Sequence, residues 1–369
     1  MIYTTLVAIR HVRATIASWR SRRTDWYLIV QEYPADALIQ WLVDMLRMPT
    51  AQTLRDVADA ASFGIGAAVS GGTLRTDPHY RDLLRKEFNV ITTENALKMG
   101  PLRPEPGVYE FSDADAIVNF GTAYDMDIRG HTLVWHNQQP DWFRGWERTP
   151  DQVESFLREH VYTVAGRYRG RIDEWDVVNE AVLDDGSLRE TVWYDAIGEE
   201  YLDAAFSWAD EVSDADLYYN DYGAEEVNDK SDGIYRLIGR LLDRDVPVDG
   251  IGFQMHALHS TPDLASVAEN VRRFQKLGLE VAFTEVDVAY QAAQKPDDHR
   301  AAQAEFYADL TALCVREGID TMVTWGVRDT DSWVPGWFPD LTDDPLLFDG
   351  GSDPKPAYYA VYEALSGER

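Results

Sequence analysis

From Thr53 onward, the sequence alternates short runs of β-branched and aromatic residues with longer amphipathic segments. The short runs are typical of β-strands, and segments with apolar residues three and four positions apart are typical of helices. The predicted strands are residues 63–69, 89–92, 128–135, 172–180, 216–220, 250–255, 281–287 and 321–325. The predicted helices are residues 80–88, 114–124, 150–168, 201–212, 232–242, 263–277, 300–317 and 356–365. Eight such repeats within about 315 residues predict an α/β fold, the (β/α)8 or TIM barrel.

An open, doubly wound parallel sheet is the alternative that the same alternation allows. Dinucleotide-binding sheets of that kind carry Gly-x-Gly-x-x-Gly in the turn after the first strand. Here Gly64 and Gly66 lie within the first predicted strand, and no such motif follows it. The barrel is therefore favoured.

Residues 1–52 differ from the rest and are predicted to form an N-terminal extension, helical or poorly ordered, before a single domain at 53–369. The first 50 residues contain six Arg and four acidic residues, whereas the whole chain has a net charge of −30. Val12–Trp19 and Ala35–Met48 have helical periodicity. Ser21-Arg22-Arg23 resembles a twin-arginine export start, but the apolar run after it is too short, so no export signal is legible and the location stays unknown.

The net charge of −30 argues against nucleic acid or an anionic membrane as a partner. No run reaches the ~20 apolar residues of a membrane span. The 64 acidic residues are accompanied by only 6 Lys among 34 basic residues, which suggests adaptation to high salt; an ordinary acidic enzyme is the alternative. The one cysteine, Cys314, lies in an apolar helical run and is expected to be a core residue.

Two glutamates, Glu180 and Glu285, lie at the ends of the fourth and seventh predicted strands. In a parallel barrel, chemistry collects at the carboxyl ends of the strands. Two carboxylates brought together there suit glycoside hydrolysis, although each Glu could instead cap a helix or face solvent. Strict alternation places Asn179 and Glu180 on opposite faces, so a bulge or twist is needed if both are functional. The chain has no His-x-His or His-Glu-x-x-His motif, so no metal site and no cofactor are expected.

Segments at the strand ends resemble those of family-ten glycoside hydrolases, the endo-β-1,4-xylanases. They occur in that family's order from about Thr53 to the end, some 85% of the chain. The matching segments are Thr93–Lys98, Gly130–His136, Trp175–Glu180, Asn220–Tyr222, Gly252–His256, Thr284–Asp287, Trp325–Trp333 and Pro354–Tyr358.

The resemblance implies a retaining endo-1,4-β-xylanase that acts on xylan or xylo-oligosaccharides, with Glu285 as nucleophile and Glu180 as general acid/base. The negative charge of Glu285 would keep Glu180 protonated until the first step is complete. Asn179 matches the residue that bonds the sugar 2-hydroxyl, His256 and Asp287 match supports of Glu285, and Trp325 and Trp333 match aromatic walls. The glycone-side sugar contacts implied are Glu94, Asn95, Lys98, His131, Trp135 and Gln138. Gln254 is a further implied substrate contact, and Asp176 and Tyr222 are implied supports.

Met99 stands where the family usually has Trp after the lysine, so weaker glycone-side binding is expected. The competing functions are a retaining β-glucanase, a transglycosylase on the same barrel and a non-catalytic sugar-binding barrel. A binder needs neither glutamate, which argues against the last. A phosphate-binding barrel would need Gly-rich loops after the seventh and eighth strands, and the chain lacks them. A polymer substrate implies an extracellular enzyme, whereas the start as given would imply a cytoplasmic one. A monomer is expected.

Overall fold

The structure is a computed structural model that describes residues 52–293 and 295–367. Apart from Gln52, the predicted N-terminal extension lies outside the described residues, and so does the predicted helical periodicity within it.

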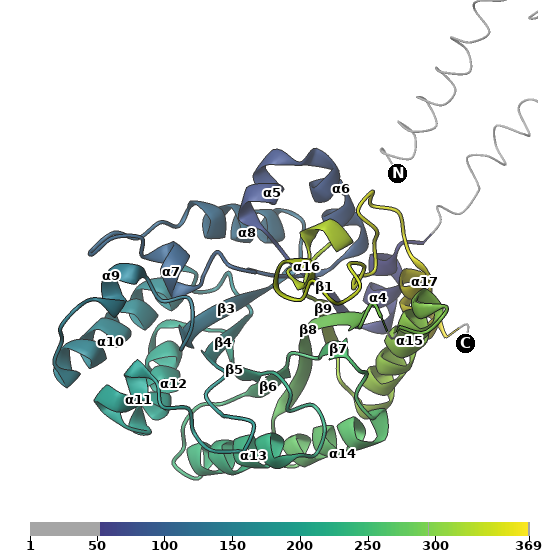
Figure 1. The fold of residues 1–369 in the computed structure, drawn as a ribbon. Helices are drawn as coiled ribbons and strands as arrows, with labels where there is room; N and C mark the ends of the chain where they lie inside the picture. The colour runs from purple at the N-terminus through teal and green to yellow at the C-terminus, as the bar shows by residue number, and fades with distance from the viewer. Residues whose placement is uncertain (1–51, 294, 368–369) are drawn as a thin grey trace, which may run out of the picture. The chain divides into compact units, whose positions relative to one another are not determined.

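The strands of the described residues form a parallel sheet that closes on itself. Eight of them follow the order β6-β5-β4-β3-β2-β1-β9-β8, and the pairing of β6 with β8 closes the barrel. In Figure 1 the strands surround the centre of the view and the helices lie outside them. The strands are β1 (Gly64–Ala68), β2 (Val90–Thr92), β3 (Asp127–Trp135), β4 (Glu174–Asn179), β5 (Asp216–Asp221), β6 (Gly250–Phe253), β7 (His256–His259), β8 (Glu280–Tyr290) and β9 (Thr321–Thr324). The predicted (β/α)8 barrel is confirmed.

Long helices alternate with the strands, and all but the first of them match the predicted amphipathic segments. They are α4 (Leu54–Ala61), α6 (Pro78–Glu87), α8 (Ser112–Ala123), α10 (Pro150–Arg167), α12 (Glu200–Val212), α13 (Asp229–Leu242), α14 (Leu264–Gln275), α15 (His299–Glu317) and α17 (Pro356–Ser366). Short helices that the sequence patterns did not predict lie between them. These are α5 (Gly71–Thr76), α7 (Met99–Leu102), α9 (Asp141–Arg144), α11 (Val192–Ile197), the 3-10 turn Asp329–Asp331 and α16 (Val334–Trp337). Helix α4 was also missed.

The sixth strand departs from the prediction of one run over 250–255. β6 ends at Phe253, and the chain resumes as β7 at His256. Met255 between them has a φ of 62°, which is left-handed backbone and interrupts the ladder. β7 then pairs with the outer half of β8, so that His256 lies opposite Asp287.

The barrel interior contains a fully buried charge in addition to apolar side chains. Arg129 on β3 is 1% exposed and forms ion pairs with Glu174 and with Asp176, both on β4. A buried charge needs such partners, because an unpaired one costs several kcal/mol in desolvation. Among the described residues no helix is long and apolar enough to cross a membrane.

Candidate active site

Glu180 follows β4 directly and has a φ of 59°, in the left-handed region. The pairing of β4 with β5 also shifts register between Asp176 and Val178. The bulge or twist expected if both Asn179 and Glu180 are functional is therefore present at this strand end. It allows consecutive side chains to enter one site, and Asn179 Nδ2 donates to Glu180 Oε1 at 3.2 Å.

The Glu180 carboxylate has hydrogen-bond donors on both oxygens. The indole N–H of Trp135 donates to Oε2 at 2.9 Å, and the amide of Gln254 donates to Oε1 at 3.1 Å. His136 Nδ1 lies 3.9 Å from Oε2. The Glu180 side chain is 12% exposed, so the group lies at the solvent-accessible edge of the barrel mouth.

Glu285 on β8 is more deeply buried, at 4% exposure. Asn220 Nδ2 donates to its Oε1 at 2.8 Å, and His256 Nε2 lies 3.3 Å from its Oε2. Burial raises the pKa of Glu285, but the charge of His131, the hydrogen bond and charge of His256, and the charge of Lys98 together lower the pKa below its ordinary value. Glu285 is therefore ionised at neutral pH.

His256 is held between two carboxylates. Its Nδ1 lies 3.0 Å from Asp287 Oδ1, and its Nε2 faces Glu285. Burial disfavours the charged ring, yet Asp287 and Glu285 raise the pKa of His256 to about 10. The ring is thus an imidazolium that donates from both nitrogens. Trp333 completes the group, since its indole N–H donates to Asp287 Oδ2 at 2.7 Å.

A second group of ionisable side chains lies next to Glu285. His131 Nδ1 lies 2.9 Å from Asp176 Oδ2 and 3.9 Å from Glu285 Oε1. Arg129 Nη2 donates to Asp176 Oδ1 at 2.6 Å. Burial raises the pKa of Asp176, but Arg129 and His131 outweigh it and lower the pKa. Arg129 was missed by the sequence reasoning, although an arginine within an apolar strand was a signal that could have been used.

Three amides connect the two glutamates. Asn220 Nδ2 contacts both Glu285 Oε1 and Asn179 Oδ1, the latter at 2.9 Å. Gln254 Nε2 contacts Asn179 Oδ1 at 3.3 Å as well as Glu180. Asn220 was not among the predicted site residues, though it occupies the same strand-end position as the others. A Cβ on Gly252 would lie 2.3 Å from Asn220 Oδ1, so glycine there leaves room for the amide.

The predicted glycone-side residues form a neighbouring group. Lys98 Nζ lies 5.0 Å from the centroid of the Trp135 ring and 5.7 Å from that of Trp325, and Nζ donates to Asn95 Oδ1 at 3.0 Å. Asn95 in turn donates to Glu94 Oε1 at 2.8 Å. Burial lowers the pKa of Lys98, and the negative charges of the nearby glutamates oppose this shift. Burial raises the pKa of Glu94, and the positive charge of Lys98 opposes that shift.

Two predicted site residues, Gln138 and Tyr222, contact groups other than the two glutamates. The backbone oxygen of Gln138 accepts from Gly100 at 2.7 Å, and the Tyr222 ring lies over Lys230 with its centroid 3.4 Å from Nζ. Met99 is 6% exposed and packs in the main hydrophobic core. The glycone-side effect expected of Met99 stays a prediction.

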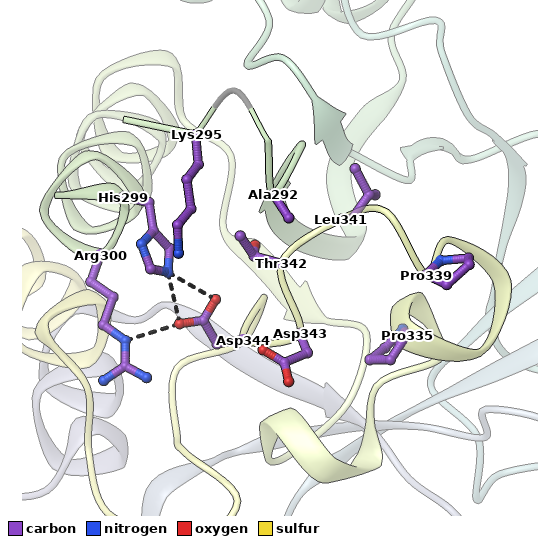
Figure 2. A pocket seen from close by; sticks show the side chains of 10 residues that line it. All are labelled: Ala292, Lys295, His299, Arg300, Pro335, Pro339, Leu341, Thr342, Asp343 and Asp344. Atoms are coloured by element: carbon purple, nitrogen blue, oxygen red, sulfur yellow. Dashed lines mark hydrogen bonds and ion pairs between the residues drawn. The ribbon is translucent and has the colours of Figure 1, made fainter. Parts of the chain in front are cut away.

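A separate cavity of about 600 Å³ lies between the segment after β8, the start of α15 and the segment around α16. Figure 2 shows His299 and Arg300 of α15 directed toward Asp344, which both of them contact. None of the predicted site residues lines this cavity. In the part of the chain that the structure describes, no group of three or more His, Cys, Asp or Glu side chains could hold a metal ion.

Comparison with known proteins agrees with this geometry. The sequence profile of glycosyl hydrolase family 10 matches residues 53–364. Endo-1,4-beta-xylanase B of Thermotoga neapolitana is 39% identical over 316 residues, which cover 85% of this chain and 91% of that protein. Beta-1,4-xylanase of Dictyoglomus thermophilum is 41% identical over 313 residues, covering 81% and 87%.

Solved structures give the same result. The crystal structure of xylanase 10B from Thermotoga petrophila RKU-1 in complex with xylobiose has 41% identity and a TM-score of 0.82, and the match covers 86% of this chain and 98% of that one. Because the family profile covers most of the chain and these relatives match nearly over their full lengths, this chain belongs to glycosyl hydrolase family 10.

Proposed function

We propose that the protein is a retaining endo-1,4-β-xylanase that hydrolyses internal β-1,4-xylosidic bonds of xylan. The observation that supports this best is the pair of glutamates, one directly after β4 and one within β8, joined by amides but placed in different surroundings. Glu285 is buried beside cations, whereas Glu180 is bonded by neutral donors. Different environments for two carboxylates suit different roles in glycoside hydrolysis.

Glu285 is the proposed nucleophile. Its lowered pKa keeps it ionised, and Asn220 and His256 fix the direction of its oxygens. In the first step an oxygen of Glu285 bonds to the anomeric carbon while the bond to the leaving oxygen breaks. Glu180 gives its proton to that oxygen, and a covalent glycosyl-enzyme results.

In the second step Glu180 is the proposed general base. Now ionised, it takes a proton from a water molecule, whose oxygen bonds to the anomeric carbon and displaces Glu285. Two inversions leave the configuration of the anomeric carbon unchanged. Trp135, Asn179 and Gln254 hold the Glu180 carboxylate in place for both proton transfers.

Sugar binding is assigned to the groups around this pair. The aromatic side chains of Trp135, Trp325 and Trp333 offer surfaces on which pyranose rings can stack. Lys98 is buried near the pair, and Glu94 and Asn95 extend the polar edge. The structure of the Thermotoga petrophila relative contains xylobiose, which supports a xylose-based substrate.

Product analysis on xylan tests this proposal, with the anomeric proton of the first product followed by NMR. Internal cleavage with the β-anomer formed first is the expected result. Initial release of the α-anomer would contradict the retaining assignment. Faster cleavage of carboxymethyl cellulose than of xylan would favour the glucanase alternative, and transfer products in place of hydrolysis would favour the transglycosylase.

The acidic surface and the assembly state belong to the same proposal. We infer from 64 acidic residues and few lysines that the enzyme works best at high salt, as a monomer. A strongly negative chain repels itself and other copies, and salt screens that repulsion.

A further inference from the structure

Three buried side chains lie behind Glu180 that the proposed chemistry does not use. Tyr219 and Asp221 are neighbours on one face of β5, and both are 0% exposed. Lys230, in the first turn of α13, is 2% exposed. The Tyr219 hydroxyl donates to Asp221 Oδ2 at 2.5 Å, and Lys230 Nζ lies 3.0 Å from Asp221 Oδ1.

The Tyr219 hydroxyl has a second bond that connects this group to the active site. The backbone N–H of Ala181 donates to it at 3.0 Å. Because the hydroxyl hydrogen is directed at Asp221, a lone pair of the oxygen is free to face Ala181. The Asp221–Lys230 ion pair therefore sets the direction of the hydroxyl, and the hydroxyl holds the peptide that joins Glu180 to Ala181.

That peptide needs support from outside, because the backbone at Glu180 is left-handed with a φ of 59°. A residue with a side chain takes this conformation only when its surroundings impose it. The backbone N–H of Glu180 donates to the backbone carbonyl of Asn220 at 2.9 Å. Arg189 Nε donates to the backbone carbonyl of Glu180, also at 2.9 Å. The bond from Ala181 to Tyr219 fixes the next N–H, so the backbone is held on both sides of Glu180.

We propose that Tyr219 is a positioning residue for Glu180, with its hydroxyl oriented by the Asp221–Lys230 pair so that it keeps the Glu180 backbone in the conformation that brings the carboxylate to the substrate. This inference rests on the acid/base role assigned to Glu180 in the proposed function. Tyr219 itself touches neither the carboxylate of Glu180 nor that of Glu285 among the contacts recorded for the described residues.

Tyr219→Phe tests the inference, since it removes only the hydroxyl. A displaced Glu180 donates its proton poorly, so kcat/KM for xylo-oligosaccharides, whose leaving group needs that proton, is expected to fall about 10-fold or more. A dinitrophenyl xylobioside has a leaving group that departs without a proton, so its kcat/KM should stay unchanged. Burial raises the pKa of Asp221 to about 7 although Lys230 opposes this, so the assays are run above that pH, where Asp221 accepts from the hydroxyl.

Tyr218→Phe is the matched control. Tyr218 is on the same strand, and its hydroxyl also donates to a carboxylate, Glu280 Oε2 at 2.8 Å, but it has no bond to the peptide after Glu180. The control should keep wild-type kcat/KM on both substrates. If Tyr219→Phe fails to fold, as a melting curve would show, Lys230→Met is measured instead and should give the same split between the two substrates.

Glu180→Ala separates failure of this inference from failure of the proposed function. If Glu180→Ala does not lower kcat/KM on xylo-oligosaccharides more than on the dinitrophenyl xylobioside, Glu180 is not the acid and the proposed function itself is wrong. The other outcome is that Glu180→Ala lowers kcat/KM on xylo-oligosaccharides and spares the dinitrophenyl xylobioside. If folded Tyr219→Phe then lowers kcat/KM on neither substrate, or on both equally, the positioning role of Tyr219 is overturned and the acid/base assignment stands.

Discussion

Replacing His256 by Gln isolates the effect of one positive charge on Glu285. The imidazolium Nε2 lies 3.3 Å from Glu285 Oε2, and the ring is charged because its pKa is raised to about 10 by Asp287 and Glu285 against the effect of burial. Gln has a similar reach and an N–H donor but no charge. The substitution therefore removes the charge while a hydrogen bond to Glu285 stays possible.

The size of the effect follows from the geometry. An opposite charge within ~4–6 Å lowers a carboxyl pKa by about 1–3 units. Asp287 neutralises part of the imidazolium field, and His131 and Lys98 remain in the variant, so the upper part of that range is excluded. The pKa of Glu285 should rise by about 1–2 units, which is about 1.4–2.7 kcal/mol of lost preference for the ionised form.

The assay is the pH profile of kcat/KM, whose limbs report the pKa values of the free enzyme. The acidic limb of His256→Gln is expected to move to higher pH by about 1–2 units. His299→Gln is the control, because His299 also contacts a carboxylate, that of Asp344, in the separate cavity of Figure 2. An acidic limb in the wild-type position for a folded His256→Gln enzyme would refute the electrostatic reasoning.

Stability gives an independent check with a defined sign. The pKa of His256 is raised from 6.5 to about 10 on folding, so its contribution to the free energy of unfolding is complete below pH 6.5 and is lost as pH rises toward 10. The difference in free energy of unfolding between wild type and His256→Gln should therefore be largest below pH 6.5 and shrink as the pH approaches 10. A difference that grows with pH would contradict the assignment of His256 as an imidazolium.

Three further predictions concern the nucleophile, the surface charge and the N-terminal segment. Glu285→Gln should lower kcat on xylan by a factor on the order of 10⁴ or more, because no glycosyl-enzyme can form; near-normal turnover would show that another group attacks. Raising NaCl from ~0.1 M to ~1 M shortens the Debye length from ~10 Å to ~3 Å, so Tm should rise, and a flat or falling Tm would contradict salt adaptation. A chain beginning at Ala51 keeps the Thr53 cap of α4 and should fold and hydrolyse xylan, whereas loss of soluble protein would show that the barrel needs the preceding residues.

The barrel could be predicted because its strands and long helices have strong, opposite periodicities. The short helices could not, since a four-residue helix such as Met99–Leu102 is too short to show a periodic pattern. The break between β6 and β7 was also missed. It depends on left-handed backbone at Met255, a residue type that gives no sequence signal for that conformation.

The site shows a similar division. Glu180 and Glu285 could be located because both end predicted strands in a barrel, where carboxyl ends converge. The partners that distinguish them could not be located in this way. Whether Asn220 bonds Glu285 depends on the direction of its side chain and on the room left by Gly252. It also depends on Thr284, whose hydroxyl donates to Asn220 Oδ1 at 2.6 Å and so orients the amide. Sequence spacing contains none of these distances.

Two left-handed residues at strand ends, among several in the described chain, supply side chains of the site or border on them. Glu180, with a φ of 59°, follows Asn179, and Met255, with a φ of 62°, separates Gln254 from His256. Regular strands would send neighbouring side chains to opposite faces, yet Asn179, Glu180 and Gln254 bond one another. Each left-handed residue costs about 1–3 kcal/mol, a large share of a typical stability of about 5–15 kcal/mol.

Both strained positions have a buried polar group that stabilises them. The Met255 N–H donates to Glu225 Oε1 at 2.9 Å, and the N–H after Glu180 donates to the Tyr219 hydroxyl at 3.0 Å. Glu225 and Tyr219 are 6% and 0% exposed, and burial raises the pKa of both. Neither contacts the glutamate pair among the bonds recorded for the described residues, so their buried polar groups are explained by the backbone they hold. Such departures from local regularity are expected where function requires them, which is why periodicity is least reliable at the catalytic strand ends.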